Sequence, residues 1–203
     1  MSQHDALNAV GNQDAKRALA VRVLDDEIEE SEVRLEERRL AFLATQHPVA
    51  GDLRAIVSIM KINDDLERIG ELSVNIIDRL PEQSSNIVDV FDFNHMGNLA
   101  ADMIQKSIDA FVLKDHLLAD KVCVLGDEVD AIQSAVFKRV TKLMKEPAAD
   151  AEQLILFLTL SRNIERMADH ATSIAQEVIY LVTGEIERHT GSSHEKLIQS
   201  LMD

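Results

Sequence analysis

Two stretches of this chain repeat each other at a nearly constant spacing, and this repeat constrains the fold more than any other feature. Residues 18–29 reappear 101 residues later as residues 119–130, with matching apolar and acidic positions. Residues 66–71 reappear 98 residues later as residues 164–169, and each copy carries a Glu-Arg pair followed by another acid. Such self-similarity indicates two copies of one supersecondary unit. We therefore expect a tandem of two similar units.

Each copy is predicted to be helical. Apolar residues recur every three or four positions, as at Ile62, Ile69 and Ile76, which is the period of a helix with one buried face. Aromatic residues make up only 3% of the chain, which favours helices over sheets. Prolines at 48 and 147 break the pattern. Helices are expected at about 13–45, 52–80, 92–113, 115–145 and 150–183.

The predicted fold is all-α, with two tandem antiparallel three-helix bundles. The second copy contains three helices, whereas the equivalent first helix of the first copy would begin before Met1, so the first bundle is expected to have a shortened first helix. Glu67 should superpose on Glu165, and Glu71 on Asp169. The expected division is a first bundle at 1–80, a linker at 81–91, a second bundle at 92–184 and a C-terminal tail at 185–203.

The charge balance limits the partners of the chain. Acids outnumber bases 36 to 21, giving a net charge of −15. Because nucleic acids present a line of negative phosphates, we expect no nucleic-acid partner; cations and basic protein surfaces are favoured instead. Cys123 is the single cysteine, which fits a reducing cytoplasm and a small core residue. The longest apolar run, residues 154–160, is too short to span a membrane.

Carboxylates form a repeated pattern near the middle of each copy. Glu67 and Glu71 are four residues apart and share a helix face, as do Glu165 and Asp169. Such pairs are common on the solvated faces of acidic proteins, so the spacing alone leaves a plain surface role open. His170 points about 100° away from Asp169 around the helix, and we expect it to pack rather than to bind a ligand.

Hairpin geometry favours a metal site at the first break. Asp25 and Glu71 are each 23 residues from Pro48, and Glu29 and Glu67 are each 19 residues from it. If the flanking helices are antiparallel neighbours, these four carboxylates lie side by side and repel one another unless a cation neutralises them. Oxygen-only ligands indicate hard metals such as Fe, Mn, Mg or Ca. Because the face points outward, we expect a shallow site with exchangeable metal.

The second hairpin gives a weaker version of this set. Around Pro147, Glu165 lies level with Asp130, while Asp169 lies level with Gly126, which has no carboxylate. We therefore expect weaker metal binding there. The candidate metal ligands of both hairpins are Asp25, Glu29, Glu67, Glu71, Asp130, Glu165 and Asp169.

The same residues carry a family resemblance. Residues 64–76, DDLERIGELSVNI, and 161–174, SRNIERMADHATSI, resemble the PhoU signature. Residues 46–54, QHPVAGDLR, and 180–184, YLVTG, also fit, so that the resemblance covers nearly the whole chain. The resemblance implies tandem three-helix bundles with acidic motifs that hold metal clusters on their surface. Gly126, where the family pattern has an acid, is a departure.

The resemblance also implies a function. PhoU proteins are non-enzymatic negative regulators of phosphate uptake and of the phosphate-starvation two-component response. The implied partners are the ATPase of the phosphate ABC transporter and the phosphate-sensing histidine kinase. The chain is accordingly expected in the cytoplasm, peripheral to the membrane only through its partners, and as a homodimer.

An alternative is a metal-storage or ferroxidase-like helical protein. Di-iron bundles place Glu and Glu-x-x-His ligands inward, toward the core. Here no Glu-x-x-His motif occurs and the acids are expected to face outward, which disfavours redox chemistry. A third hypothesis is an inert bundle with solvated acids. Metal titration distinguishes the inert bundle from the other two hypotheses. An oxidase assay distinguishes the ferroxidase-like protein from the regulator.

Overall fold

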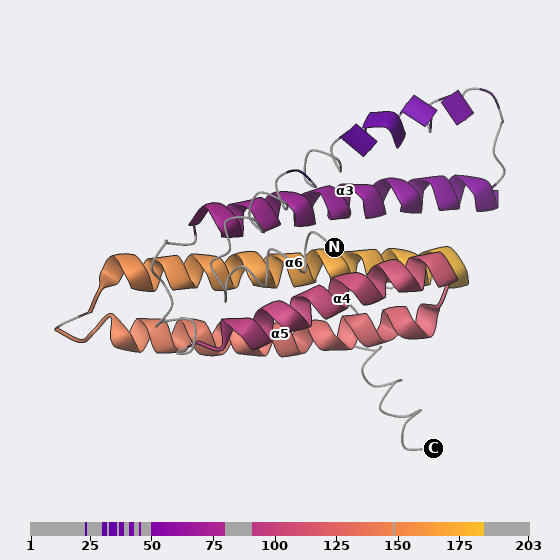
Figure 1. The fold of residues 1–203 in the computed structure, drawn as a ribbon. Coiled ribbons are helices and arrows are strands. Elements are labelled where there is room, and N and C mark those ends of the chain that lie inside the picture. The colour runs from indigo at the N-terminus through magenta and orange to yellow at the C-terminus, as the bar shows by residue number, and fades with distance from the viewer. Residues whose placement is uncertain are drawn as a thin grey trace, which may run out of the picture.

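The part of the chain that the structure describes is entirely helical where it is regular. The computed structural model describes residues 50–79 and 91–184, apart from 148, together with scattered helical residues between 23 and 45. Its long elements, shown in Figure 1, are α3 (Ala50–Arg79), α4 (Phe93–Leu113), α5 (His116–Leu143) and α6 (Ala151–Thr183). Their bounds agree with the expected helices to within two residues, so the all-α prediction is confirmed.

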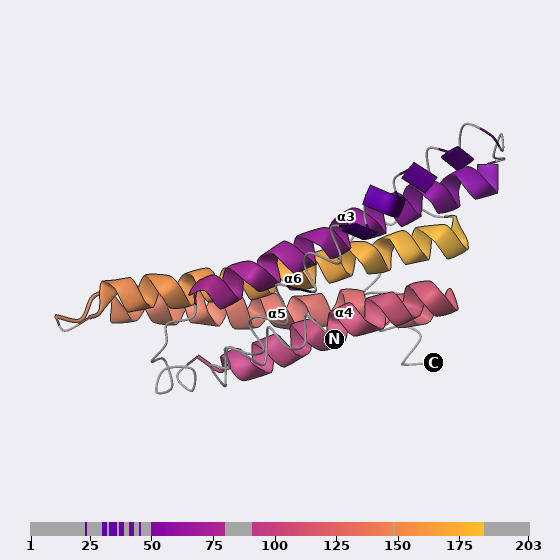
Figure 2. The same ribbon diagram turned by 45° about the horizontal axis from the view of Figure 1, so that its top comes forward.

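Helix α6 lies at the centre of this arrangement. Helices α4, α5 and α6 pack against one another as a three-helix bundle, and α3 packs along another side of α6. Figures 1 and 2 show α3 running beside α6, away from the α4–α5 pair. Helices α3 and α6 run in opposite directions. Arg54 near the start of α3 contacts Tyr180 near the end of α6, and Asp65, later in α3, contacts His170, earlier in α6. The helices that correspond in the two copies are therefore antiparallel neighbours.

Side chains set the ends of the helices in the second bundle. Asp115 caps α5 by accepting a hydrogen bond from the backbone N–H of Leu118 at 3.0 Å, and Asp150 caps α6 in the same way. Asp52 is a different case. It lies within the first turn of α3, where its charge suits the helix dipole.

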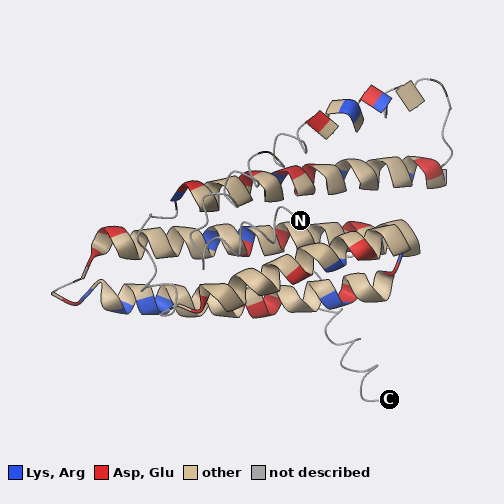
Figure 3. Ribbon diagram, in the orientation of Figure 1, with Lys and Arg blue, Asp and Glu red and all other residues tan. Residues whose placement is uncertain are grey.

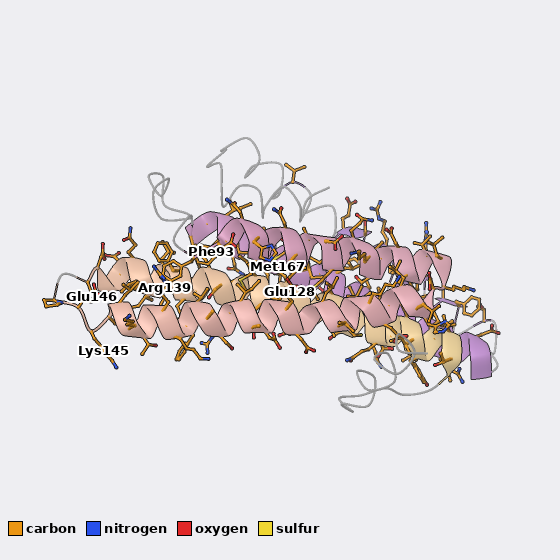
Figure 4. All side chains as sticks on the ribbon, turned by 90° about the horizontal axis from the view of Figure 1, so that it is seen from below. Phe93, Glu128, Arg139, Lys145, Glu146 and Met167 are labelled. Atoms are coloured by element: carbon orange, nitrogen blue, oxygen red, sulfur yellow. The ribbon has the colours of Figure 1, made fainter. Side chains whose placement is uncertain are left out.

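The core consists of aliphatic and methionine side chains with a small aromatic cluster at one end. Phe91, Phe93 and Phe157 have ring centroids 5.2 to 5.8 Å apart and join the start of α4 to α6. Figure 4 labels Phe93 and Met167 among the helices, while Lys145 and Glu146 lie at the α5–α6 turn. Cys123 is half-buried against this core, as expected.

The buried face of α3 is less apolar than its sequence suggests. Ile62, Ile69 and Ile76 are buried as predicted, but Ser58 and Ser73 are buried with them. The Ser73 hydroxyl donates to the backbone carbonyl of Ile69 at 2.7 Å, so its burial leaves no unpaired donor. Small side chains at these positions allow a close approach by a neighbouring helix.

The end of α6 provides a test of the fold. Gly184 has φ +78°, and a Cβ built there would lie 2.5 Å from Arg54 Nη1. We predict that Gly184→Ala lowers the free energy of unfolding by about 1 kcal/mol, because of the left-handed backbone and the displaced guanidinium. Gly51→Ala is the matched control, since nothing lies within 4 Å of its Cβ position in α3. Thermal unfolding that ranks Gly184→Ala at or above Gly51→Ala in stability would contradict this.

Candidate carboxylate site

The structure brings three of the predicted ligands together on the outer side of the second hairpin. Asp130 lies on α5, and Glu165 and Asp169 lie one turn apart on α6. The charge of Asp130 acts on both α6 carboxylates. Asp130 and Asp169 are exposed and Glu165 is half-buried, so the outward orientation inferred from sequence is correct for this set. Figure 3 shows acidic residues in red on both of these helices.

These carboxyl groups hold their protons more tightly than isolated acids do. Partial burial is the largest cause of the raised pKa of Glu165, and the negative charges of Asp169 and Asp130 raise this pKa further. Nearby Arg162 and Arg166 oppose this increase. Although Asp169 as a whole is exposed, partial burial of its carboxyl group raises its pKa, Asp130 adds to this, and His170 and Arg166 oppose it. The set therefore carries mutual repulsion that the neighbouring guanidinium groups do not cancel.

The raised pKa of Asp130 has a different second cause. Partial burial is again the largest cause of the raised pKa. The charge of Asp127, three residues earlier on the same helix, raises the pKa of Asp130 further. The α5 side of the set thus extends along the helix toward its N-terminal half.

The structure shows what surrounds Gly126, the position that lacks the fourth acid. A Cβ at Gly126 would lie 3.1 Å from Thr172 Oγ1 and 3.8 Å from Met103 Cε. A side chain at this position would therefore require the Thr172 hydroxyl to shift by a few tenths of an ångström. Space is tight at this point between α5 and α6.

The first hairpin is described mainly on its α3 side. Glu67 and Glu71 are half-exposed on α3, and Arg68 Nη1 donates to Glu71 Oε2 at 2.7 Å. This hydrogen bond, followed by the charge of Glu71, raises the pKa of Arg68. Arg68 therefore forms an ion pair within α3. Asp25 and Glu29 lie outside the described residues, so the four-carboxylate arrangement stays a prediction.

The acids share a face without converging on one point. Within residues 50–79 and 91–184, no group of three or more His, Cys, Asp or Glu side chains is close enough to hold a metal ion. The donor chemistry still fits a hard cation, because the second set offers only carboxylate oxygens, and Arg162 and Arg166 offset their repulsion only in part. Metal binding at Asp130, Glu165 and Asp169 stays a prediction.

Polar contacts between α3 and α6 were not found by sequence reasoning. His170 Nδ1 lies 2.8 Å from Asp65 Oδ1, so His170 packs between the two copies, as expected of a residue outside the ligand set. Nearby, Glu177 accepts hydrogen bonds from Ser58 and Lys61. The charged residues were visible in the sequence, but periodicity does not indicate which helices face each other.

The fold and site define a class, a tandem helical-bundle protein with acidic outer faces. A family model described as the PhoU domain matches residues 2–80 and again residues 93–178. These two segments cover most of the chain, and the chain belongs to the PhoU family. The gap between them falls at the expected linker, although the domain boundaries themselves stay a prediction.

Relatives and solved structures agree with this assignment. A Pseudomonas aeruginosa protein named phosphate-specific transport system accessory protein PhoU homolog is 36% identical, covering 95% of this chain and 81% of its own length. A Clostridium acetobutylicum protein of the same name is 34% identical, covering 89% and 84%. The crystal structure of PhoU from Pseudomonas aeruginosa has a TM-score of 0.83 at 34% identity, covering 91% of this chain and 90% of that one. The Streptococcus pneumoniae PhoU structure has a TM-score of 0.81 at 25% identity, with 92% and 89% covered.

The raised carboxyl pKa values predict a gain in stability when the charges are removed. The folded state keeps these protons to a higher pH than the unfolded chain, so the free energy of unfolding falls as pH rises from about 4 through the folded-state pKa values. We predict that Glu165→Gln with Asp169→Asn raises the Tm at pH 7 in metal-free buffer. Because the groups are largely solvated, the gain is below about 1 kcal/mol, or about 2–4 °C.

The pH dependence and a control variant make this prediction specific. The gain should vanish near pH 3, where these carboxyl groups are protonated in both the folded and unfolded states. Glu177→Gln should instead lower the Tm at pH 7, since Glu177 is paired with Lys61. A double variant that is less stable than the wild type at pH 7 would show that these acids stabilise the fold.

Proposed function

We propose that this chain is a non-enzymatic cytoplasmic regulator that restrains phosphate uptake and the phosphate-starvation response. The main support is the family match over both halves, together with 36% identity to a named phosphate-transport accessory protein across 95% of the chain. In this proposal the chain binds the ATPase of the phosphate ABC transporter and the phosphate-sensing histidine kinase, and holds both in a low-activity state when phosphate is plentiful.

The chain acts through its surfaces. Its net charge of −15 favours basic protein surfaces and disfavours nucleic acid. Within the ranges that the structure describes, no helix combines the length and the low charge needed to cross a membrane. We therefore propose that it reaches the membrane through the transporter and the kinase. We further propose a homodimer, which would double the faces available to these partners.

Metal binding is the second part of the proposal. Hard cations, Fe, Mn, Mg or Ca, would be held by Asp130, Glu165 and Asp169 at the second hairpin. The support is the chemistry of the set, because the charge of Asp130 adds to the raised pKa of both Glu165 and Asp169, and neighbouring arginines offset this only in part. At the first hairpin the set would be Asp25, Glu29, Glu67 and Glu71. Bound cations would lower the local negative charge on the acidic faces.

The storage or ferroxidase alternative receives less support. Its ligands would have to lie inside a bundle. In the structure Asp130 and Asp169 are exposed, and Glu67, Glu71 and Glu165 are half-exposed. An acid set on the outside suits exchangeable metal better than an enclosed redox centre.

Deletion of the gene tests the regulatory role. We predict constitutive expression of phosphate-starvation genes and excess phosphate uptake in high phosphate, because nothing would then restrain the kinase and the transporter. The readouts are a starvation-promoter reporter and uptake of labelled phosphate, with plasmid complementation as the control. A deletion strain that represses the reporter normally but tolerates iron poorly would support the storage alternative instead.

Metal analysis of purified variants tests the ligand sets. We predict that Glu67→Gln with Glu71→Gln removes most bound metal, and that Glu165→Gln with Asp169→Asn removes a smaller share because the second hairpin lacks one acid. Glu128→Gln is the matched control, since this exposed acid of α5 faces His95 of α4. Metal content is measured by mass spectrometry after dialysis against Mn²⁺. Equal metal content in the wild type and the three variants would show that these acids are only solvated surface residues.

A further inference from the structure

The outward side of α5 carries a regular series of residues that the core does not use. Figure 4 looks onto this side of α5 and labels Lys145 near one end. Positions spaced alternately by four and three residues follow one side of a helix, as in the seam of a coiled coil. One such series contains six exposed and two half-buried residues, running along α5 and just past its end. We call it the outer seam: Asp120, Val124, Asp127, Ala131, Ser134, Lys138, Thr141 and Lys145.

The charges of the outer seam are ordered along the helix. Its acids, Asp120 and Asp127, lie in the first half, and its lysines, Lys138 and Lys145, lie in the second. Residues 131–145 contain three lysines, one arginine and no acid, although the chain has a net charge of −15. Figure 3 shows blue residues on α5 near the turn to α6 and red ones farther back. The helix dipole favours acids only in the first turn and bases only in the last, so it does not account for Asp127 or Lys138.

The lysines of the outer seam are available to another molecule. Among the residues that the structure describes, no ion pair includes Lys138 or Lys145. Asp127 and Lys138 are 11 residues apart, which is about 16 Å along the helix axis, so they do not meet within one chain. A partner with acids at the spacing of these lysines would therefore pair with them.

The outer seam is complementary to itself when it is reversed. Its spacing of alternately four and three residues is the same from either end. Two copies of α5 can therefore lie antiparallel about a two-fold axis between Ala131 and Ser134, and a two-fold axis makes every contact occur twice. The facing pairs are then Asp120 with Lys145, Asp127 with Lys138, Val124 with Thr141, and Ala131 with Ser134.

The order of charges selects a second copy of this chain as the occupant. Small side chains at the centre of a seam fit many helices, but an acidic half followed by a basic half requires a partner with the opposite order. The same helix turned end to end has that order. The net charge of −15 on each copy does not prevent association, because charges more than about 8 Å apart are largely screened at physiological salt.

The first copy of the repeat lacks this property. The positions 101 residues before Ala131 and Lys138 are occupied by Glu30 and Glu37, so the corresponding series there has acids where α5 has a small residue and a lysine. Self-complementary charge order is therefore a feature of α5 and not of the repeat.

We propose that two copies of this chain associate through the outer seam of α5, antiparallel and about a two-fold axis between Ala131 and Ser134. The acids of each seam pair with the lysines of the other. The inference rests on the homodimer in the proposed function and specifies its interface. Because α3 lies on the other side of α6, the interface leaves α3 of each chain accessible to other partners.

Charge reversal tests the interface in the full-length protein. Sedimentation equilibrium is measured at physiological salt from about 1 to 100 µM, which spans the affinity expected of a small polar interface, and EDTA excludes metal-bridged association. We expect the wild type to dimerise. Lys138→Glu with Lys145→Glu should raise the Kd of the dimer at least tenfold, since each substitution acts twice and makes the whole seam acidic. Asp120→Lys with Asp127→Lys should do the same by making the seam basic.

A mixture of these two variants gives the most specific readout. An acidic seam complements a basic one, so the mixture should form a heterodimer at a concentration where each variant alone is monomeric. A chain with all four substitutions should also dimerise, because its charge order is reversed but still complementary to itself. Glu30→Lys with Glu37→Lys is the matched control, since it makes an equal charge change at exposed acids of another helix. Circular dichroism and Tm measurements confirm that each variant is folded.

Three outcomes would overturn the interface: seam variants that dimerise as tightly as the wild type, a mixture that stays monomeric, or an equal loss in the control. A wild type that stays monomeric while the seam substitutions abolish binding of the kinase or the ATPase would assign this face to a partner protein instead.

The same data separate this inference from the proposed function. If the wild type dimerises but the seam variants do so equally well, the homodimer stands and this interface is wrong. If the wild type is monomeric over the whole range, the homodimer and its interface both fail, while the deletion strain decides the regulatory role independently.

Discussion

The burial of α6 on two sides is the constraint on which the rest of the described structure depends. Twelve of its 33 residues are buried, compared with seven of the 29 residues of α3 whose burial the structure describes. One side packs against α4 and α5 and the other against α3, so both copies of the repeat meet at this helix. Small residues among the buried ones, Ala168, Ala171 and Ala175, permit close helix approach, while Ile164 and Ile174 supply apolar area.

Polar groups determine how the copies fit together. A helix that is apolar on two sides would tolerate several positions of α3 along it, because apolar packing has little directional preference. The Asp65–His170 contact and the pairing of Lys61 with Glu177 favour one register. Arg54 over the ring of Tyr180 extends this contact to the end of α6, beside Gly184. These interactions are half-buried, so each contributes modestly, and their importance lies in alignment.

Much of the fold was predictable from local sequence, and the site only in part. Helix bounds followed from Pro147 and the apolar period, because these act within a few residues. The clustering of Asp130 with Glu165 also followed, since a hairpin fixes which residues lie level. The buried Ser58 and Ser73 and the Asp65–His170 contact did not follow, because they depend on which helix packs against α3. The close approach of Thr172 to Gly126 likewise appears only when α5 and α6 are placed together.

The acid faces connect the fold to the proposed function, because surface charge determines which partners can approach. The central claim is that this chain binds the cytoplasmic part of the phosphate-sensing kinase and the transporter's ATPase. The direct measurement is biolayer interferometry with each purified partner immobilised and this chain in solution at physiological salt. The account predicts saturable binding to both partners that strengthens at lower ionic strength. Absence of binding to both, with a folded and active kinase and ATPase on the sensor, would contradict it.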